Sequence, residues 1–472
     1  MVNDIYFNSV REIVKAIQNR NVSVKEVMQA HLAQINKVNP QVNAIVSLNE
    51  EIAMKEAELA DKKIQSGEKL GPLHGIPMAI KDTEQAKGFP ATSGSLLFKD
   101  RIATEDNIAT ERLRAAGAII IGKTNVPEFG AGAHTFNEVF GKTLNPYNLG
   151  RTAGGSSGGA AVAVSTGMLP IADGSDTGGS LRFPAAFNNV VGIRTSPGRV
   201  PRFPKDFPFS PQAVQGSIAR TTSDAAYMLS VIAGPDNRSP IAIEEPGSIF
   251  LESLERDMKG ARIAYSADFG GEIPIEPQVR EQFMKQLEVF EAMGCKLEEI
   301  HPDMTNAEEI FQVFRAHEFE TAMGGLMDKH RELFKPSLIW NIEMGRNLRG
   351  PQIGQADRMR TELFHRFRAF FAKYDAFLLP VSPVSPFDAN LEYPLSIDGV
   401  KMNTYLEWMK TCYYITVSGS PAISVPGGFT ADGLPFGLQI VGGHRRDLDV
   451  LRIGHAFEQA TQYGKTRPEL AK

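Results

Sequence analysis

Two serines in one short stretch of this chain stand beside paired glycines. Residues 154–182 read GGSSGGAAVAVSTGMLPIADGSDTGGSLR, so Ser156 follows one glycine pair and Ser180 follows another. A serine hydroxyl becomes a catalytic nucleophile only where backbone can approach it closely and a proton acceptor lies within reach. Glycine permits that approach and lets backbone N–H groups converge on a developing oxyanion. The stretch therefore indicates catalysis by a serine hydroxyl.

A lysine earlier in the chain is the candidate proton acceptor. The segment Pro-Met-Ala-Ile at 77–80 predicts a short buried strand that ends on Lys81 and Asp82. If the lysine were exposed, it would extend to water and pair with Asp82. If it were buried, its pKa would fall, and the neutral amine would accept a proton from a serine, as in Ser–Lys variants of the catalytic triad. The residues alone leave both roles open.

Three other patterns fit less well. The segment GSSGG at 155–159 matches G-x-S-x-G with Ser157 at its centre, but that motif needs a hydrophobic strand running directly into the turn, and residues 148–153 predict no strand. A phosphate-binding loop would need Gly-Lys-Ser/Thr after the glycines, which is missing. The nine histidines are scattered without H-x-x-x-H or H-E-x-x-H spacing, so no metal site is predicted and a Ser-His-Asp triad has no distinctive candidate.

Composition narrows the class of protein. The chain has 472 residues, of which 42% are hydrophobic and 22% charged, as is ordinary for a soluble globular protein. Its net charge of −5 argues against a nucleic-acid partner held by a basic surface. Two cysteines are too few for a disulfide framework or a thiolate zinc site and fit a reducing compartment. No signal sequence or long apolar run is evident, so we expect a cytoplasmic protein with no membrane partner.

Hydrophobic periodicity predicts alternating strands and helices, and hence a mostly parallel sheet covered on both faces. Two segments interrupt the alternation: 197–216 is expected to be an irregular surface loop, and 235–258 a connection into the second half. The expected strands lie at 44–48, 77–80, 118–122, 190–193, 261–265, 376–379, 422–425 and 438–441. The expected helices begin after Ser9 and Ser23, the second ending at Asn39-Pro40, and continue at 50–65, 106–116, 221–233, 277–293, 305–330, 356–373 and 447–460.

Together these motifs resemble the amidase signature family. The resemblance rests on Lys81, on GGSSGG around Ser156 and on DTGGSLR around Ser180. It is supported by Gly75-Ile76-Pro77, Gly122-Lys123-Thr124-Asn125, the segment 140–146 (FGKTLNP), Arg182-Phe183-Pro184-Ala185-Ala186, the segment 421–426 (PAISVP) and the segment 433–439 (GLPFGLQ). The similarity is dense over 65–235 and returns at 420–442.

The resemblance implies a single α/β domain over 1–472, with a large twisted mixed β-sheet of about ten strands covered by helices on both faces. It implies a catalytic core at about 65–235 and a more variable substrate-pocket half at about 236–420. No metal or cofactor is implied. The site residues implied are Ser180 as nucleophile, Ser156 as proton relay after a cis peptide at Gly155, Lys81 as base, and backbone N–H groups of Thr177, Gly178, Gly179 and Ser180 as the oxyanion hole. Ser157 is expected to hold the lysine or the turn, and Asp176 and Arg182 to form a supporting ion pair.

The implied reaction is hydrolysis of a carboxylic acid amide to an acid and ammonia or an amine, through an acyl-enzyme. One alternative is the glutaminase subunit of a tRNA-dependent amidotransferase, although such subunits continue after Val-Val-Gly with a Met-Lys-Pro-Thr-Tyr-Gly-like run where residues 193–198 read IRTSPG. Another is hydrolysis of aryl esters, anilides or carbamates (urethanes) with the same triad, and a third is a binding protein that keeps the fold without chemistry. The expected partner is a small-molecule amide, and the sequence leaves open whether the chain forms a homodimer or acts as a monomer. Trp408 or Tyr413 is a candidate for lining the acyl pocket.

Overall fold

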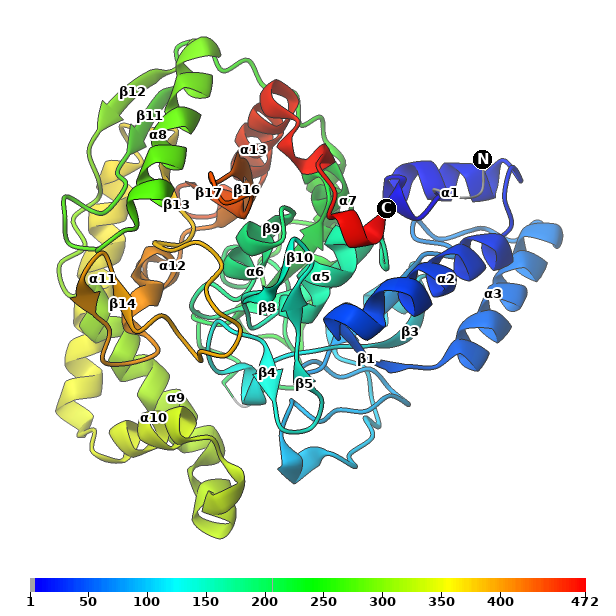
Figure 1. The fold of residues 1–472 in the computed structure, drawn as a ribbon, viewed down its shortest axis with the longest axis horizontal. Coiled ribbons are helices and arrows are strands. Elements are labelled where there is room, and N and C mark those ends of the chain that lie inside the picture. The colour runs from blue at the N-terminus through cyan, green and yellow to red at the C-terminus, as the bar shows by residue number, and fades with distance from the viewer. Residues whose placement is uncertain (1–4, 206) are drawn as a thin grey trace.

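The structure, a computed structural model, describes residues 5–205 and 207–472 and is built around one large sheet (Figure 1). The sheet has eight strands in the order β12-β11-β13-β17-β16-β9-β10-β8. Their bounds are β8 Ile171–Asp176, β9 Val191–Arg194, β10 Val214–Ala219, β11 Arg262–Tyr265, β12 Lys296–Glu299, β13 Ala376–Pro380, β16 Ala422–Phe429 and β17 Pro435–Val441.

The sheet is mixed, as the family resemblance implied, and the expectation of a mostly parallel sheet is wrong. Within this eight-stranded sheet, β11 pairs in parallel with β12 and with β13, and the other neighbouring pairs are antiparallel. The reason lies in the connections. The chain passes from β9 to β10 and from β16 to β17 without a crossover helix, and strands joined in that way return antiparallel.

A separate three-stranded sheet carries Lys81. It has the order β1-β3-β2, with β1 at Ile45–Leu48, β2 at Pro77–Lys81 and β3 at Ile119–Thr124. Strand β2 packs beside β8 of the large sheet, but the Asp173 side chain accepts the Lys81 backbone N–H at 2.9 Å. The Asp173 side chain therefore occupies the Lys81 N–H group, which a backbone carbonyl of β8 would accept if β2 were paired with β8. Strand β2 stays in its own sheet, and the large sheet has eight strands where about ten were expected.

Helices cover both faces of the large sheet. One group consists of α5 (Gly158–Ser165) and α6 (Arg182–Phe187), which contact each other and strands of the sheet. In a second group, α13 (Asp447–Thr461) contacts both α7 (Thr222–Ile232) and α8 (Pro277–Ala292), and all three contact strands of the sheet. Four helices lie beyond the sheet at the left and lower left of Figure 1: α9 (Ala307–His330), α10 (Pro336–Arg346), α11 (Gly350–Phe370) and α12 (Lys410–Ser418). The remaining ones are α1 (Val10–Gln18), α2 (Val24–Val42), α3 (Glu50–Gln65) and α4 (Ile108–Ala115). Across the described ranges, no helix is both long and apolar enough to cross a bilayer.

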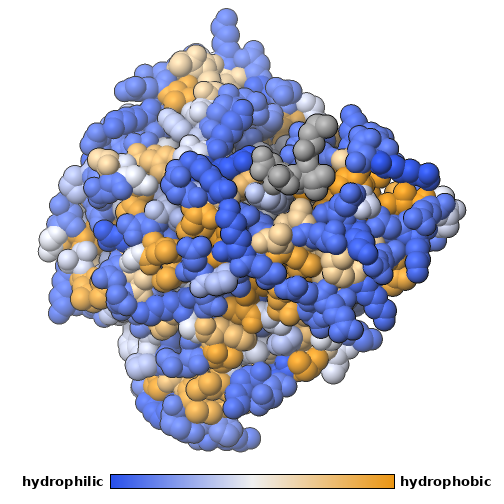
Figure 2. All heavy atoms as spheres, turned by 45° about the vertical axis from the view of Figure 1, so that its right-hand side comes forward, coloured by the Kyte–Doolittle hydropathy of each residue, from blue (hydrophilic) through white to orange (hydrophobic). Residues whose placement is uncertain are grey.

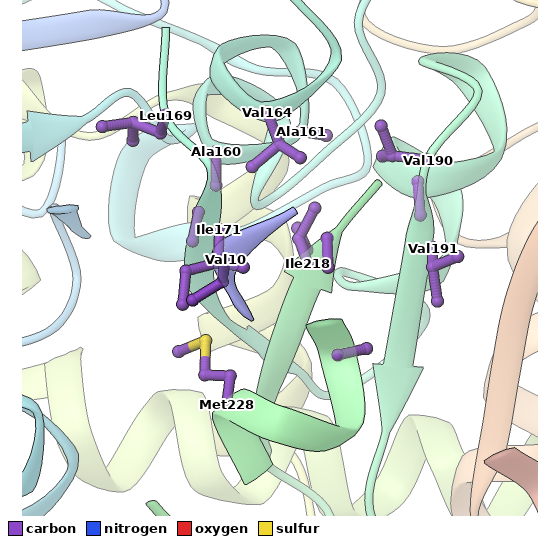
Figure 3. Close-up of a cluster of buried hydrophobic side chains, with 14 of the residues drawn as sticks. Val10, Ala160, Ala161, Val164, Leu169, Ile171, Val190, Val191, Ile218 and Met228 are labelled. Carbon is purple, nitrogen blue, oxygen red and sulfur yellow. The ribbon is translucent and has the colours of Figure 1, made fainter. Parts of the chain in front are cut away.

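Helix α5 anchors the core between the two serine motifs. All its residues are buried, which fits a sequence that is apolar on every side. Figure 3 shows its Ala160, Ala161 and Val164 near Ile171 of β8 and Ile218 of β10. Burial of this cluster fixes the distance between the start of α5, two residues after Ser156, and the end of β8, which leads to Ser180.

Strands β8 and β10 were not expected from the sequence. Asp, Gly and Ser, which are depleted in strands, make up most of β8. The predicted surface loop at 197–216 is irregular over most of its length, but its last three residues, 214–216, begin β10 and are buried. Arg199 and Val200 are also buried, so this segment lies only partly on the surface.

Two local expectations are wrong by small margins. Helix α2 continues past Asn39-Pro40 to Val42. A proline so near the end removes only one backbone N–H from the last turn, so the helix is not broken there. Asn43 then ends the helix in a left-handed conformation with φ of 51°. Residues Asn148–Thr152 do form a strand, β7, which pairs with β6 (Leu144–Asn145) in a two-stranded sheet. Its first three residues are exposed, so it lacks the hydrophobic pattern that predicts a buried strand.

The surface mixes polar and apolar residues. On the face in Figure 2, hydrophobic residues are exposed in separate groups between hydrophilic ones. Phe209 is the most exposed of the large hydrophobic side chains in the described ranges, at 74%. It lies on the loop between β9 and β10.

Close packing of α5 predicts a large effect of a very small substitution. A Cβ atom at Gly159 would lie 2.4 Å from the Asn125 nitrogen and 2.5 Å from the Ala44 oxygen, both backbone atoms that cannot move aside. We expect Gly159→Ala to lower the free energy of unfolding by about 1–3 kcal/mol through overpacking. Urea unfolding followed by circular dichroism measures this change.

The matched control is Gly325→Ala in α9, where no atom lies within 4 Å of the added Cβ. There alanine should raise stability by up to about 1 kcal/mol, because it is the better helix former. Equal effects at the two glycines would contradict the close approach of α5.

Candidate active site

The Lys81 amine is the centre of the candidate site. Its side chain is fully buried at the end of β2. The Nζ atom lies 2.8 Å from Ser156 Oγ, 2.8 Å from Ser157 Oγ and 3.1 Å from Ser175 Oγ. The structure therefore places this lysine against hydroxyl groups, not in water beside Asp82. Asp82 instead accepts hydrogen bonds from Thr92 and Gly94.

Ser157 holds the lysine, as expected. Its Oγ also lies 3.5 Å from the Ser175 carbonyl oxygen, so its own proton has an acceptor and its lone pairs face Lys81. A neutral amine has two N–H donors and one lone pair. Ser157 and Ser175 can accept from the two donors, which leaves the lone pair for the Ser156 hydroxyl proton.

The segment that carries Ser180 packs directly against this group. The Ser157 backbone N–H donates to the Ser180 carbonyl at 3.2 Å. The peptide bond between Gly155 and Ser156 is cis, which confirms the conformation implied by the resemblance. Ser156 and Ser180 are 3% and 7% exposed, so neither hydroxyl is freely hydrated. Gly130 lies close to the Ser156 side chain, since a Cβ atom at Gly130 would be 3.5 Å from Ser156 Oγ.

Two residues of β8 that support Lys81 were not identified from the sequence. Ser175 contacts the Lys81 amine, and Asp173 accepts the Lys81 backbone N–H. Residues two apart on a strand point to the same face, so the Asp-x-Ser spacing before Asp176 is the signal that would have found both. That signal is readable only once 171–176 is known to be a strand.

The other face of β8 supports the turn before Ser180. Asp176 is fully buried and pairs with Arg182 at 2.9 Å, as expected, and with Arg194 at 3.2 Å, which the sequence did not suggest. Its carboxylate also accepts the N–H groups of Gly179 at 2.9 Å and Leu181 at 3.1 Å. Asp176 therefore fixes the backbone on both sides of Ser180.

These contacts separate the expected oxyanion donors into two kinds. The Gly179 N–H already donates to Asp176, so it serves to hold the turn. In the described part of the chain, the N–H groups of Thr177, Gly178 and Ser180 find no hydrogen-bond acceptor. These three are the donors that remain open to an anion.

Burial and neighbouring charges shift the pKa values of the site. Burial lowers the pKa of Lys81 to about 8, against the opposing effect of Glu84, Asp173 and Asp176. Burial raises the pKa of Asp173 to about 6. Although burial alone would raise the pKa of Asp176, the charges of Arg182 and Arg194 outweigh it and hold that pKa well below its usual range.

Apolar side chains stand next to the turn. A Cβ at Gly178 would lie 3.0 Å from Phe311 Cζ and 3.4 Å from Met409 Cε. The Phe311 ring stacks on Tyr413, with centroids 4.3 Å apart. Tyr413 thus lies behind Phe311, and its buried hydroxyl has no hydrogen-bond partner in the described ranges. Trp408, the other aromatic proposed from the sequence, packs on Phe183 with centroids 4.8 Å apart and is 1% exposed.

The histidines take no part in this cluster. In the described residues no histidine ring is hydrogen-bonded to a serine; His134, for example, bonds to Thr152 and to the Ala389 carbonyl, and burial lowers its pKa to about 4. Among those same residues, no group of three or more His, Cys, Asp or Glu could hold a metal ion.

A hollow of about 810 Å³ lies away from this cluster. It runs along the first half of α9, and Glu308, Gln312 and Tyr414 are among the residues that line it. None of its lining residues belongs to the serine–lysine cluster. The side-chain geometry around Lys81, and not the size of a cavity, therefore marks the candidate site.

Comparison with known proteins covers nearly the whole chain. The family model described as Amidase matches residues 26–451. The chain is 36% identical over 474 residues to an acylamidase of Rhodococcus erythropolis, covering 98% of each protein. It is 34% identical to a glutamyl-tRNA(Gln) amidotransferase subunit of Geobacillus thermodenitrificans, covering 99% of this chain and 100% of that one. Its fold is similar to that of a bacterial aryl acylamidase of the amidase signature family, with a TM-score of 0.90, 30% identity and coverage of 97% and 98%.

The ion pairs of Asp176 predict a strong dependence of stability on one carboxylate. Asp176→Asn keeps the size of the side chain but leaves Arg182 and Arg194 buried without a countercharge. We expect the free energy of unfolding to fall by about 3–5 kcal/mol, measured by urea unfolding. Glu281→Gln, which removes an exposed i, i+4 pair with Lys285, is the control and should change little. A similarly small change at Asp176 would show that water or rearrangement compensates the arginines.

Proposed function

Because this chain belongs to the Amidase (amidase signature) family, we propose that it hydrolyses a carboxylic acid amide through an acyl-enzyme on Ser180. One observation carries the proposal: a fully buried lysine amine lies 2.8 Å from the Ser156 hydroxyl, beside the segment that holds Ser180. A lysine in that position serves as a base because burial favours its neutral form.

In the proposed first half-reaction, Ser180 Oγ attacks the amide carbonyl carbon. Its proton passes to Ser156 Oγ while the Ser156 proton passes to Lys81 Nζ. The carbonyl π electrons move to oxygen, and the resulting oxyanion accepts hydrogen bonds from the N–H groups of Thr177, Gly178 and Ser180. When the C–N bond breaks, the proton returns along the same path to the leaving nitrogen, so ammonia or an amine departs and the acyl-enzyme remains.

In the second half-reaction a water molecule takes the place of the amine. It attacks the acyl carbon while its proton moves through Ser156 to Lys81. The ester bond to Ser180 then breaks, Ser180 regains its proton, and the carboxylic acid leaves. Amide and water are thus converted into acid and amine, and the three side chains return to their starting states.

The apolar residues next to Gly178 are expected to select the kind of group that the substrate carries. Phe311 and Met409 adjoin Gly178, two residues before Ser180, so we expect them to contact a group bound to Ser180. They favour an aromatic or aliphatic acyl or leaving group over a strongly polar one. Aryl amides (anilides), aryl esters and carbamates are therefore the substrates to be tested first, which agrees with the likeness to the acylamidases.

The second candidate is a glutaminase subunit of a tRNA-dependent amidotransferase, favoured by 34% identity over the full length of such a protein. Activity of the purified chain separates the two. An amidase hydrolyses simple amides and anilides alone, whereas a glutaminase subunit would act on glutamine and depend on its partner subunits. The panel should therefore include glutamine, an anilide, an aliphatic amide, an aryl ester and a carbamate.

We expect the covalent intermediate to form on Ser180. Treatment with a fluorophosphonate followed by peptide mass spectrometry should place the adduct on Ser180, because that serine lies on the turn that carries the open N–H groups. The label should disappear in Ser180→Ala. An adduct on Ser157 would refute the assignment and favour the G-x-S-x-G interpretation.

The base assignment predicts a pH dependence. Lys81 accepts a proton only when neutral, so kcat/KM should rise with pH, by about tenfold per unit below the pKa, and level off above about 8. Lys81→Arg should lose at least about 1,000-fold in kcat/KM, since guanidinium does not deprotonate at working pH. Lys99→Arg at an exposed position is the control and should retain activity. A fully active Lys81→Arg would mean that another group is the base.

A further inference from the structure

The loop between β9 and β10 reaches back to the region behind Lys81. Lys205 on this loop lies with its Nζ 3.3 Å from Glu84 Oε2. The Lys205 side chain is 24% exposed, whereas that of Glu84 is 2% exposed. The pair therefore joins a loop at the surface to a carboxylate in the interior.

Glu84 is rigidly connected to Lys81. Its backbone N–H donates to the Lys81 carbonyl at 2.8 Å, which closes the turn at the end of β2. Asn107 donates to its carboxylate at 2.8 Å, and the Lys123 amine donates to its backbone carbonyl. A carboxylate so deeply buried needs charged or polar partners, and Lys205 supplies the positive charge in direct contact.

The charges around Lys81 have opposing effects. Glu84, Asp173 and Asp176 favour the ammonium form of Lys81, while Lys205 disfavours it. Burial alone would raise the pKa of Glu84, but Lys205, Arg202 and Lys81 outweigh it and lower that pKa. The charged groups that face this cluster from the packed elements are Lys81, Asp82, Glu84, Lys123, Asp173, Asp176, Arg202 and Lys205.

We propose that the Glu84–Lys205 ion pair is an electrostatic positioning element for the reaction, through which the β9–β10 loop controls how readily Lys81 accepts a proton. The inference rests on the proposed function of Lys81 as base. Neither Glu84 nor Lys205 touches the reacting atoms. Glu84 holds the turn that aims Lys81, and Lys205 offsets the Glu84 charge that would otherwise keep Lys81 protonated.

The two members of the pair should act with opposite signs. Removing the Glu84 charge removes a group that stabilises the Lys81 ammonium, so the rise of activity should begin at lower pH in Glu84→Gln. Removing the Lys205 charge removes a group that destabilises the Lys81 ammonium, so the rise of activity should begin at higher pH in Lys205→Met. In that variant Asn107 still donates to Glu84, and the charge of Arg202 still acts on it. A purely structural ion pair would give the same loss for both variants and no displacement of the pH profile.

The experiment measures the rate of fluorophosphonate labelling of Ser180 against pH in the full-length chain. We expect displacements of roughly half a pH unit, to lower pH for Glu84→Gln and to higher pH for Lys205→Met, with the double variant between them. Lys205→Arg keeps the charge and should match the wild type. Glu318→Gln removes the charge at another contact of the loop, where Ser210 and Gln212 donate to Glu318, and should also leave the profile in place.

Each outcome decides the inference. Displacement in the same direction for both variants, or none, overturns it, because the pair would then act only in holding the loop. If Glu84→Gln does not fold, the two Lys205 variants decide alone. A displaced pH profile in Lys205→Met with an unchanged profile in Lys205→Arg supports the inference, and any other pattern overturns it. Failure of the proposed function is seen separately, in the wild type, as absent labelling of Ser180 or labelling without a pH-dependent rise.

Discussion

Burial of a lysine amine among hydroxyl groups is the constraint on which the site depends. An ammonium ion is costly to bury without a carboxylate in contact, and the groups in contact with Lys81 Nζ are the serine oxygens of Ser156, Ser157 and Ser175 with the Ser175 carbonyl. The carboxylates of Glu84, Asp173 and Asp176 act on it from further away. This balance places the pKa of Lys81 at about 8, where both protonation states are accessible near neutral pH.

Strand β8 divides the charges of the site into two sets. Asp173 and Ser175 face Lys81, while Asp176 faces the arginines on the opposite side. The alternation of side chains along one strand thus keeps Lys81 apart from the Arg182–Asp176–Arg194 cluster, which holds the turn at Ser180. Because both sets belong to one rigid strand, their separation does not depend on loop conformation.

The likeness to acylamidases and to an amidotransferase subunit over their full lengths means that the fold does not distinguish their substrates. What could distinguish them lies close to Gly178. Phe311 comes from α9, and Met409 adjoins α12, two elements of the second half of the chain. The residues proposed as catalytic come from the first half of the chain, so the proposed reaction and the proposed specificity rest on different parts of the sequence.

The sequence by itself carries the motifs on which the proposed chemistry rests. Lys81, Ser156, Ser180 and the glycines beside them are local motifs, and glycine patterns and apolar periodicity are properties of neighbouring residues. It also predicted most helices and the mixed sheet of the family. Only the tertiary structure brings Ser175, Asp173, Arg194 and the Glu84–Lys205 pair next to the residues of these motifs. These contacts join segments up to about 120 residues apart, as from Glu84 to Lys205. Their partners are chosen by how β2, β8 and the β9–β10 loop pack, and no local pattern specifies that.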